Sequence, residues 1–294
     1  MVKIADRILF YLFLKPLSYF PLGILYFYAM IVSFLTYRVI RYRRKVVHGN
    51  LVRAFPDKSA AEIQKIERDF YRHFMDFIAE SIKAVSISKK QVLKRTSIKN
   101  PELLEELAKQ NRSVIVVCGH YNNWEFYALS LPELVPSYTP YSVYQPLSNP
   151  FFDKILFRSR TRYGMNLIKT REVIPFFKNS THQEKLVVIV NDQSPSNKKK
   201  AHWNTFLNQE TGWNIGPEKL AQKFDHVVLF GHSERVKRGY YEVEFKLITE
   251  DPPSMPKGEI TDVYSKMLEE LIISDPKNWL WSHKRWKHQR PDGV

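Results

Sequence analysis

Helix-type and strand-type patterns alternate along most of the chain, and this alternation restricts the possible folds more than any other feature of the sequence. Short apolar runs at Ser113–Cys118, Leu186–Val190 and Val227–Phe230 are typical of buried strands. Residues 240–248 alternate strictly between apolar and polar types, which predicts a fourth strand. Helical patterns separate these segments. The sequence therefore predicts an α/β fold with a mixed, largely parallel central sheet flanked by helices.

Several helix boundaries can be read directly from the sequence. Ser59-Ala-Ala-Glu62 has the form of a capping box, and apolar residues follow it at spacings of three and four. Asn100-Pro101 is a second helix start, with proline at the first helical position. Amphipathic helices are also expected over residues 217–224 and 261–273, whereas the polar stretch Ser194–Lys200 is expected to be a loop.

The N-terminal region carries a long apolar stretch from Leu22 to Ile40, whose one charged residue is Arg38. As a helix, its uncharged part rises roughly 24 Å, slightly less than the ~30 Å hydrocarbon core of a bilayer. The preceding stretch Ile8–Phe20 is also apolar, but Lys15 and Pro16 interrupt it. One tilted membrane span and a broken, partly inserted helix pair both fit this pattern. A buried core helix is the remaining alternative.

A basic flank follows the apolar stretch and predicts its orientation. It consists of Arg38, Arg41, Arg43, Arg44 and Lys45. Positive residues next to a membrane span stay in the cytoplasm. We therefore expect residues 1–45 to anchor the chain in a membrane and residues 46–294 to form one domain on the cytoplasmic face.

The charge balance and the cysteine count narrow the possible partners. The chain has 45 Lys plus Arg against 30 Asp plus Glu, a net charge of +15. Such an excess suits nucleic acid, an anionic bilayer, a phosphorylated lipid or an acidic carrier protein. The basic residues are spread along the chain and form no nucleic-acid-binding module, which argues against nucleic acid. The single cysteine, Cys118, excludes an intramolecular disulfide and any CxxC motif, and we expect it to be buried.

The candidate chemistry lies in the segment from Cys118 to Glu125, directly after the first predicted strand. His120 stands at the carboxyl end of that strand, where open α/β sheets place their ligands. Asn122 or Asn123 can cap a helix that contains Glu125 in its first turn. The Glu125 carboxylate could then hold one imidazole nitrogen while the other removes a proton from a substrate hydroxyl. No second histidine has the spacing of a zinc site, so no metal or other cofactor is expected.

Five blocks along the chain together resemble the late lipid A acyltransferases of the lysophospholipid acyltransferase superfamily. The resemblance covers most of the chain. In order, the blocks are Gly49-Asn50-Leu51 to Ala54-Phe55-Pro56, the His120–Glu125 spacing, Asn149 to Gly164 with its arginines, Asn191-Asp192-Gln193, and Trp279 to Lys287.

The resemblance implies a glycerolipid acyltransferase-like fold and transfer of a fatty acyl chain from an acyl carrier protein to a lipid A hydroxyl. By the same resemblance, His120 is the general base and Glu125 its partner, at the bacterial inner membrane. Asn122 and Asn123 stand where the family has bulky apolar residues. Candidate substrate contacts are Arg158, Arg160, Arg162, Asp192, Gln193 and Asn123; Asp192 and Gln193 could equally brace His120.

Some alternatives remain open at this point. The acceptor could be another lipid, such as a lysophospholipid, a glycolipid or an aminolipid. The same His-Glu pair could activate water in a hydrolase, and a non-enzymatic protein that binds anionic lipid or nucleic acid is a third reading. The tryptophans of the last block either anchor in lipid headgroups or pack on the body of the protein.

Overall fold

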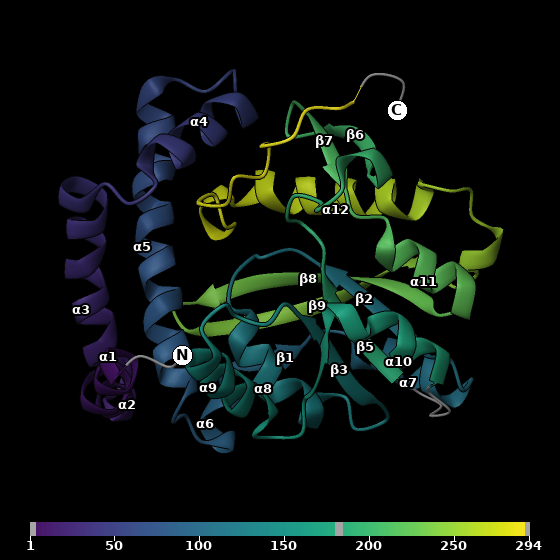
Figure 1. The fold of residues 1–294 in the computed structure, drawn as a ribbon, viewed down its shortest axis with the longest axis horizontal. Coiled ribbons are helices and arrows are strands. Elements are labelled where there is room, and N and C mark those ends of the chain that lie inside the picture. Colours follow the sequence, from purple (N-terminus) through teal and green to yellow (C-terminus); the bar gives the residue numbers. More distant parts are fainter. Residues whose placement is uncertain (1–3, 180–184, 292–294) are drawn as a thin grey trace.

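The computed structural model describes residues 4–179 and 185–291, and its centre is a seven-stranded sheet (Figure 1). The strand order is β1-β9-β8-β2-β5-β3-β4. Neighbouring strands are parallel except for the antiparallel pair β8 and β9, so the expected mixed, largely parallel sheet is confirmed. Its strands are β1 (Thr96–Ile98), β2 (Val114–Cys118), β3 (Thr139–Tyr144), β4 (Asn166–Lys169), β5 (Lys185–Val190), β8 (Val227–Lys237) and β9 (Tyr240–Thr249).

The four predicted strands correspond to β2, β5, β8 and β9, although β8 extends seven residues beyond its predicted end. The sequence did not indicate β1, β3 and β4. It also did not indicate a separate antiparallel hairpin, β6 (His202–Phe206) and β7 (Gln209–Trp213). That hairpin follows the stretch predicted as a loop, where Lys198–Lys200 form a short 3-10 turn.

Helices cover both faces of the sheet, and the side chains of β2 alternate between the two layers. Ile115 and Val117 pack in the core beneath α12, whereas Val114 and Val116 pack in the core beneath α7 and α8. The helices of the body are α4 (Arg44–Ala54), α5 (Ala60–Ala84), α6 (Lys89–Leu93), α7 (Pro101–Lys109), α8 (Trp124–Leu134), α9 (Pro150–Thr161), α10 (Val173–Asn179), α11 (Gly216–Phe224) and α12 (Glu259–Ser274).

Helix α5 begins with the predicted capping box, in which Ser59 and Glu62 bond each other's backbone N–H groups. Helix α7 begins at Pro101, as predicted. The Asn100 side chain does not cap it, and instead bonds the backbone N–H and C=O of Phe245 on β9.

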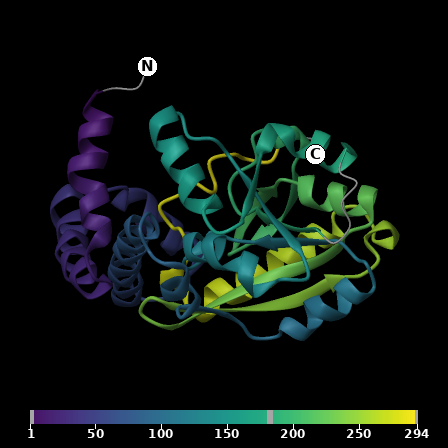
Figure 2. The same cartoon turned by 90° about the horizontal axis from the view of Figure 1, so that it is seen from below.

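The N-terminal region forms a helix pair along one side of the molecule (Figure 2). The first helix runs through α1 (Ile4–Ile8), a π-helical stretch (Leu9–Leu14) and α2 (Lys15–Tyr19), so Lys15 and Pro16 do not end it. The break comes at Pro21. After it, α3 (Leu22–Phe34) continues into a second π-helical stretch (Leu35–Ile40).

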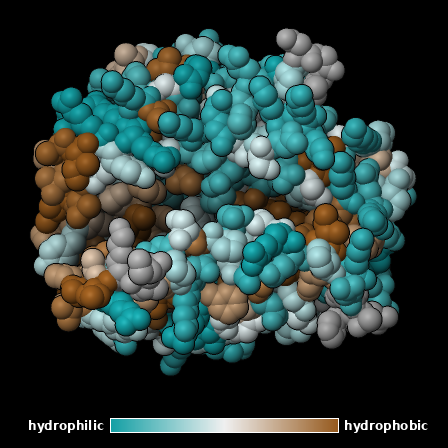
Figure 3. All heavy atoms as spheres, in the orientation of Figure 1, coloured by the Kyte–Doolittle hydropathy of each residue, from teal (hydrophilic) through white to brown (hydrophobic). Residues whose placement is uncertain are grey.

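Helix α3 and its π-helical extension form one helix of 19 residues that is long and apolar enough to cross a membrane. One face of α3, with Leu22, Leu25, Tyr26 and Ala29 at helical spacing, is buried against α5. The other face exposes large apolar side chains, among them Phe27, Ile31 and Phe34. Figure 3 shows hydrophobic surface gathered at the edge of the molecule where α3 lies.

Candidate active site

The turn between β2 and α8 carries His120, and its backbone leaves little choice of residue. A Cβ at Gly119 would lie 2.7 Å from the Cδ1 of Leu268 on α12 and 3.2 Å from a carboxylate oxygen of Asp192, so a larger residue would require these side chains to shift. Asn122 adopts a left-handed conformation (φ 57°), which asparagine tolerates better than most residues. Asn123 is the N-cap of α8, because its carboxamide oxygen accepts a hydrogen bond from the Phe126 N–H at 3.0 Å.

His120 is paired with Asp192, which agrees with the bracing role that the sequence left open for Asp192, and not with Glu125, the expected partner. The His120 Nδ1 lies 2.5 Å from one Asp192 carboxylate oxygen, and the His120 backbone N–H donates to the other at 2.8 Å. The register of the parallel strands explains the contact. Cys118 of β2 lies opposite Val190 of β5, so the residues two positions further along each strand come side by side.

Asp192 is buried but well supplied with hydrogen bonds. The indole N–H of Trp279 donates to its carboxylate at 2.7 Å, in addition to the two bonds from His120. Burial alone would raise the pKa of Asp192. The charge of His120 and these hydrogen bonds outweigh that effect and hold the pKa of the carboxyl below its usual value. Asp192 is therefore an anion that fixes the orientation of the imidazole.

Glu125 lies in the first turn of α8, as predicted, but its carboxylate is held by Arg160 of α9. The two side chains form a bidentate pair, with N···O distances of 2.9 and 2.6 Å. Trp124 stands next to His120, with its ring edge-on to the imidazole and the ring centroids 5.0 Å apart. The bonds of Glu125 to Arg160 and of His120 to Asp192 thus keep the two predicted partners in separate pairs.

The structure separates the three candidate arginines. Arg160 lines the central cavity. Arg162 instead donates to the backbone carbonyls of Ala84, Val85 and Ile87, where it closes the C-terminal end of α5. Arg158 is exposed and does not line that cavity. Of the three candidate arginines in the Asn149 to Gly164 block, Arg160 alone therefore lies at the candidate site.

Two further candidates also lie in different settings. Gln193 lines the cavity, and its carboxamide nitrogen lies 3.4 Å from the Nε2 of His120. Asn123 is fully buried, and its side chain is engaged with Phe126 and with Glu80 of α5. Asn123 therefore fixes the first turn of α8 and does not line the cavity.

The cavity in front of His120 has a volume of about 980 Å³. Apolar side chains from β2, β5, β9 and α8 line one part of it, including Val116, Val188, Phe245 and Leu131. Another part reaches α11, where the exposed lysines Lys219 and Lys223 stand one helical turn apart. Figure 3 shows the molecule hollowed across the middle of this face, with hydrophobic residues inside the hollow. Such a cavity can hold a long apolar chain next to His120.

The C-terminal block, Trp279 to Lys287, contacts the site residues His120 and Asp192. Trp279 and Trp281 are buried, so the interpretation that they pack on the body is confirmed and they are not headgroup anchors. The N–H of Leu280 donates to the carbonyl of His120 at 3.2 Å, and Tyr121 forms a β-bridge with Trp279. The sequence singled out this segment as a block of the family resemblance, and the structure shows that it contacts His120 and Asp192.

Cys118 lines the same cavity but is a poor nucleophile. Burial raises the pKa of its thiol to about 12, and the negative charge of Asp192 adds to the effect. Cys118 lies in strand β2, as expected, but it is only partly buried. Within residues 4–179 and 185–291, no group of three or more His, Cys, Asp or Glu side chains is arranged to hold a metal ion.

Comparison with known sequences places this geometry in a family. The profile described as "Bacterial lipid A biosynthesis acyltransferase" matches residues 2–288. The lipid A biosynthesis lauroyltransferase of Escherichia coli K12 is 22% identical over 275 residues, covering 93% of this chain and 88% of the relative. The lipid A biosynthesis palmitoleoyltransferase of the same organism is 23% identical over 297 residues, covering 96% of this chain and 95% of the relative.

Proposed function

Because this chain belongs to the bacterial lipid A biosynthesis acyltransferase family, we propose that it moves a fatty acyl chain from an acyl carrier protein thioester to a hydroxyl of a lipid A precursor. The observation that carries the proposal is the pairing of His120 with the buried Asp192 carboxylate at the wall of a large, partly apolar cavity. An aliphatic hydroxyl attacks a thioester efficiently when a positioned base removes its proton, and this pair supplies such a base.

In the proposed reaction, His120 Nε2 takes the proton of the acceptor hydroxyl. At the same time, the hydroxyl oxygen forms a bond to the carbonyl carbon of the thioester. Asp192 holds Nδ1, fixes the tautomer and stabilises the imidazolium that forms. The carbon–sulfur bond then breaks, and the proton on Nε2 passes to the departing sulfur. The products are the acyl ester and the free thiol of the carrier, and His120 returns to its neutral state.

Arg160 and Gln193 are the proposed contacts to the polar parts of the substrates. Glu125 occupies two nitrogens of Arg160 and so fixes the plane of the guanidinium at the cavity wall. A fixed guanidinium suits a phosphate or a sugar oxygen of the acceptor. The Gln193 carboxamide lies beside the reacting nitrogen of His120, where its N–H can donate to the thioester oxygen as negative charge develops.

The basic surface supports a donor that is an acidic carrier. The net charge is +15, and two of the positive residues, Lys219 and Lys223, stand at the cavity wall. A carrier with an acidic surface and a phosphate-bearing arm would meet complementary charge there. The proposed orientation, with the folded body on the cytoplasmic face of the inner membrane, follows from the basic residues after α3. Two of them, Arg43 and Arg44, also bond the body through Ser282 and Glu67.

The test joins an assay with purified enzyme to an analysis of cells. Purified enzyme is offered acyl carrier protein or coenzyme A thioesters together with a lipid A precursor, a lysophospholipid or a glycolipid. We expect the carrier thioester and the lipid A precursor to be the preferred pair, and His120→Ala to lower turnover by at least ~10²-fold. Lipid A from cells lacking the gene should lose one acyl chain, restored by the wild type and not by His120→Ala. Unchanged lipid A would contradict the proposed acceptor.

A further inference from the structure

A buried carboxylate behind the active-site turn links four elements of the fold. Glu80 of α5 has no exposed surface. Its carboxylate accepts hydrogen bonds from the Tyr26 hydroxyl at 2.5 Å, the Tyr241 hydroxyl at 2.7 Å and the Asn123 carboxamide nitrogen at 2.5 Å. These donors come from α3, β9 and the cap of α8, and each is buried as well. The proposed mechanism does not use Glu80.

The bond to Asn123 leads directly to the residues that surround His120. The oxygen of the Asn123 carboxamide caps α8 through the Phe126 N–H, and its nitrogen is held by Glu80. Both ends of the carboxamide are therefore fixed. The next two residues are Trp124, which packs edge-on against His120, and Glu125, which holds Arg160. A shift of the Asn123 cap would therefore move both of these contacts.

The bond to Tyr26 brings the apolar N-terminal helix into the same network. Tyr26 lies on the buried face of α3 with Leu22, Leu25 and Ala29. Its hydroxyl and the Asn123 nitrogen bind different oxygens of the same carboxylate. The Glu80 carboxylate thus connects α3 to the N-cap residue of α8.

We propose that Glu80 is a positioning residue for acyl transfer, which fixes the Asn123 cap, and with it Trp124 and Glu125, against the seated helix α3. The inference rests on the proposed function, because its effect is measured on the rate of acyl transfer. Glu80 does not touch the substrate. It acts by limiting the number of positions that the first turn of α8 can adopt.

The first test compares Glu80 with a matched residue on the same helix. Glu67 is likewise unexposed, but its carboxylate bonds Arg44 and His48 of α4. We expect Glu80→Ala to lower kcat per folded enzyme at least ~10-fold, with the KM for the donor changed by less than about 2-fold. Glu80→Gln should recover most of this loss, because an amide can still bond Asn123 and the two hydroxyls. Glu67→Ala should lose stability while keeping kcat within about 2-fold.

The second test separates the capping of α8 from the link to Glu80. Asn123→Asp keeps an oxygen that caps the helix, since aspartate is as good an N-cap as asparagine. It replaces the N–H donor by a second carboxylate facing Glu80, and two carboxylates in contact favour sharing a proton. We expect kcat to fall at neutral pH and to recover partly as the pH is lowered toward 5.5, relative to the wild type.

Two outcomes would overturn the inference while leaving the proposed function intact. One is an equal loss of kcat in Glu80→Ala and Glu67→Ala, which would reduce Glu80 to a general contributor to stability. The other is an Asn123→Asp enzyme with the kcat and pH profile of the wild type. By contrast, a wild-type enzyme that transfers no acyl chain would contradict the proposed function itself.

Discussion

At the scale of single residues, two carboxylates serve the site in different ways. Asp192 is buried and bonds the imidazole directly, whereas Glu125 bonds Arg160, which faces the cavity. A carboxylate that fixes the base matters for the proton transfer itself. One that fixes an arginine proposed to contact the substrate matters for how the substrate is held. The two residues should therefore differ in the kinetic constant that they control.

Asp192→Asn is expected to lower kcat by about 10² to 10⁴-fold with little change in KM. The amide keeps the shape of the side chain but favours the wrong imidazole tautomer and cannot stabilise the imidazolium. Steady-state rates with varied donor and acceptor test this. A variant with more than a tenth of the wild-type kcat would show that Asp192 does not orient the base.

Arg160→Lys is expected to raise the KM for the acceptor more than it lowers kcat. Lysine keeps the charge next to Glu125 but cannot form the bidentate pair that fixes the guanidinium plane. Arg158→Lys, two residues earlier on the same helix and outside the cavity, is the matched control and should behave as wild type. Equal effects in the two variants would show that Arg160 has no special role in binding the acceptor.

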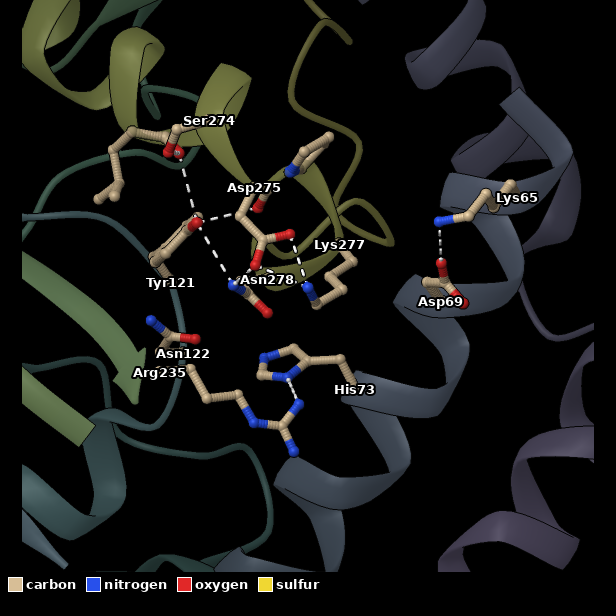
Figure 4. Close-up of polar contacts among 12 residues, drawn as sticks. Lys65, Asp69, His73, Tyr121, Asn122, Arg235, Ser274, Asp275, Lys277 and Asn278 are labelled. Atoms are coloured by element: carbon tan, nitrogen blue, oxygen red, sulfur yellow. Dashed lines mark hydrogen bonds and ion pairs between the residues drawn. The ribbon is translucent and has the colours of Figure 1, made fainter. Parts of the chain in front are cut away.

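The buried His73 makes stability depend on pH. Its Nδ1 lies 3.1 Å from Arg235, and the ring sits between Arg235 and Lys277 (Figure 4). Burial, together with the charges of Arg235 and Lys277, lowers the pKa of His73 to about 3. Between pH 6.5 and about 3 the unfolded chain binds a proton that the folded chain does not, so stability falls as the pH falls.

His73→Gln is expected to remove this part of the pH dependence. Between pH 6.5 and 5 the wild type should lose roughly 1.6 kcal/mol that the variant keeps, because the slope is half of 1.36 kcal/mol per pH unit at pH 6.5 and approaches that value as the pH falls. Urea unfolding at the two pH values measures the difference. Equal slopes in wild type and His73→Gln would contradict the assignment.

At the scale of elements, the C-terminal segment depends on α4 for its position. The Asn50 carboxamide nitrogen donates to the carbonyls of both Trp281 and His283 at 3.0 Å. That segment in turn supplies Trp279 to Asp192 and Leu280 to the His120 carbonyl. The Gly49-Asn50-Leu51 block and the tryptophan block, far apart in the sequence, thus contact each other. Together they hold Trp279 and Leu280 against the site.

Asn50→Ala is expected to destabilise the fold by roughly 1–3 kcal/mol, because it leaves two carbonyls in a buried region without their donor. Unfolding in urea measures the change, and the remaining folded enzyme should also lose activity. Asn197→Ala, which removes an exposed capping side chain on the Lys198–Lys200 turn, is the comparison and should cost less. A cost for Asn50→Ala below that of Asn197→Ala would contradict the proposed support.

Local patterns were enough to predict much of the fold and part of the site. Strands β2 and β5 are continuous apolar runs, and the α5 capping box is a local motif. Strand β1 is only three residues long, Thr96–Ile98, and exists because it pairs with β9. The pairing of His120 with Asp192 depends likewise on β5 lying next to β2 in a fixed register. That neighbourhood is a long-range property which the spacing of five between His120 and Glu125 could not reveal.

At the scale of the whole molecule, the apolar N-terminal helix is part of the folded body as well as a candidate membrane span. Leu22, Leu25, Tyr26 and Ala29 are buried in a cluster with residues of α5, α8 and β9. The division at residue 45, expected from the sequence, would cut through this cluster. An anchor that served only to hold the protein at a membrane would need no such contact.

Deletion of residues 1–41 is therefore expected to destabilise the body and not simply release it from the membrane. Loss of the packing of about three large side chains, at roughly 1.5–3 kcal/mol each, corresponds to a fall in Tm of about 10 °C or more for a body of this size. Thermal unfolding in detergent measures it, with deletion of residues 1–20 as the comparison, since that chain keeps α3 and should lose less. If the chain lacking residues 1–41 unfolds within a few degrees of wild type, α3 is a separable anchor. In that case the boundary at residue 45 is a true domain boundary.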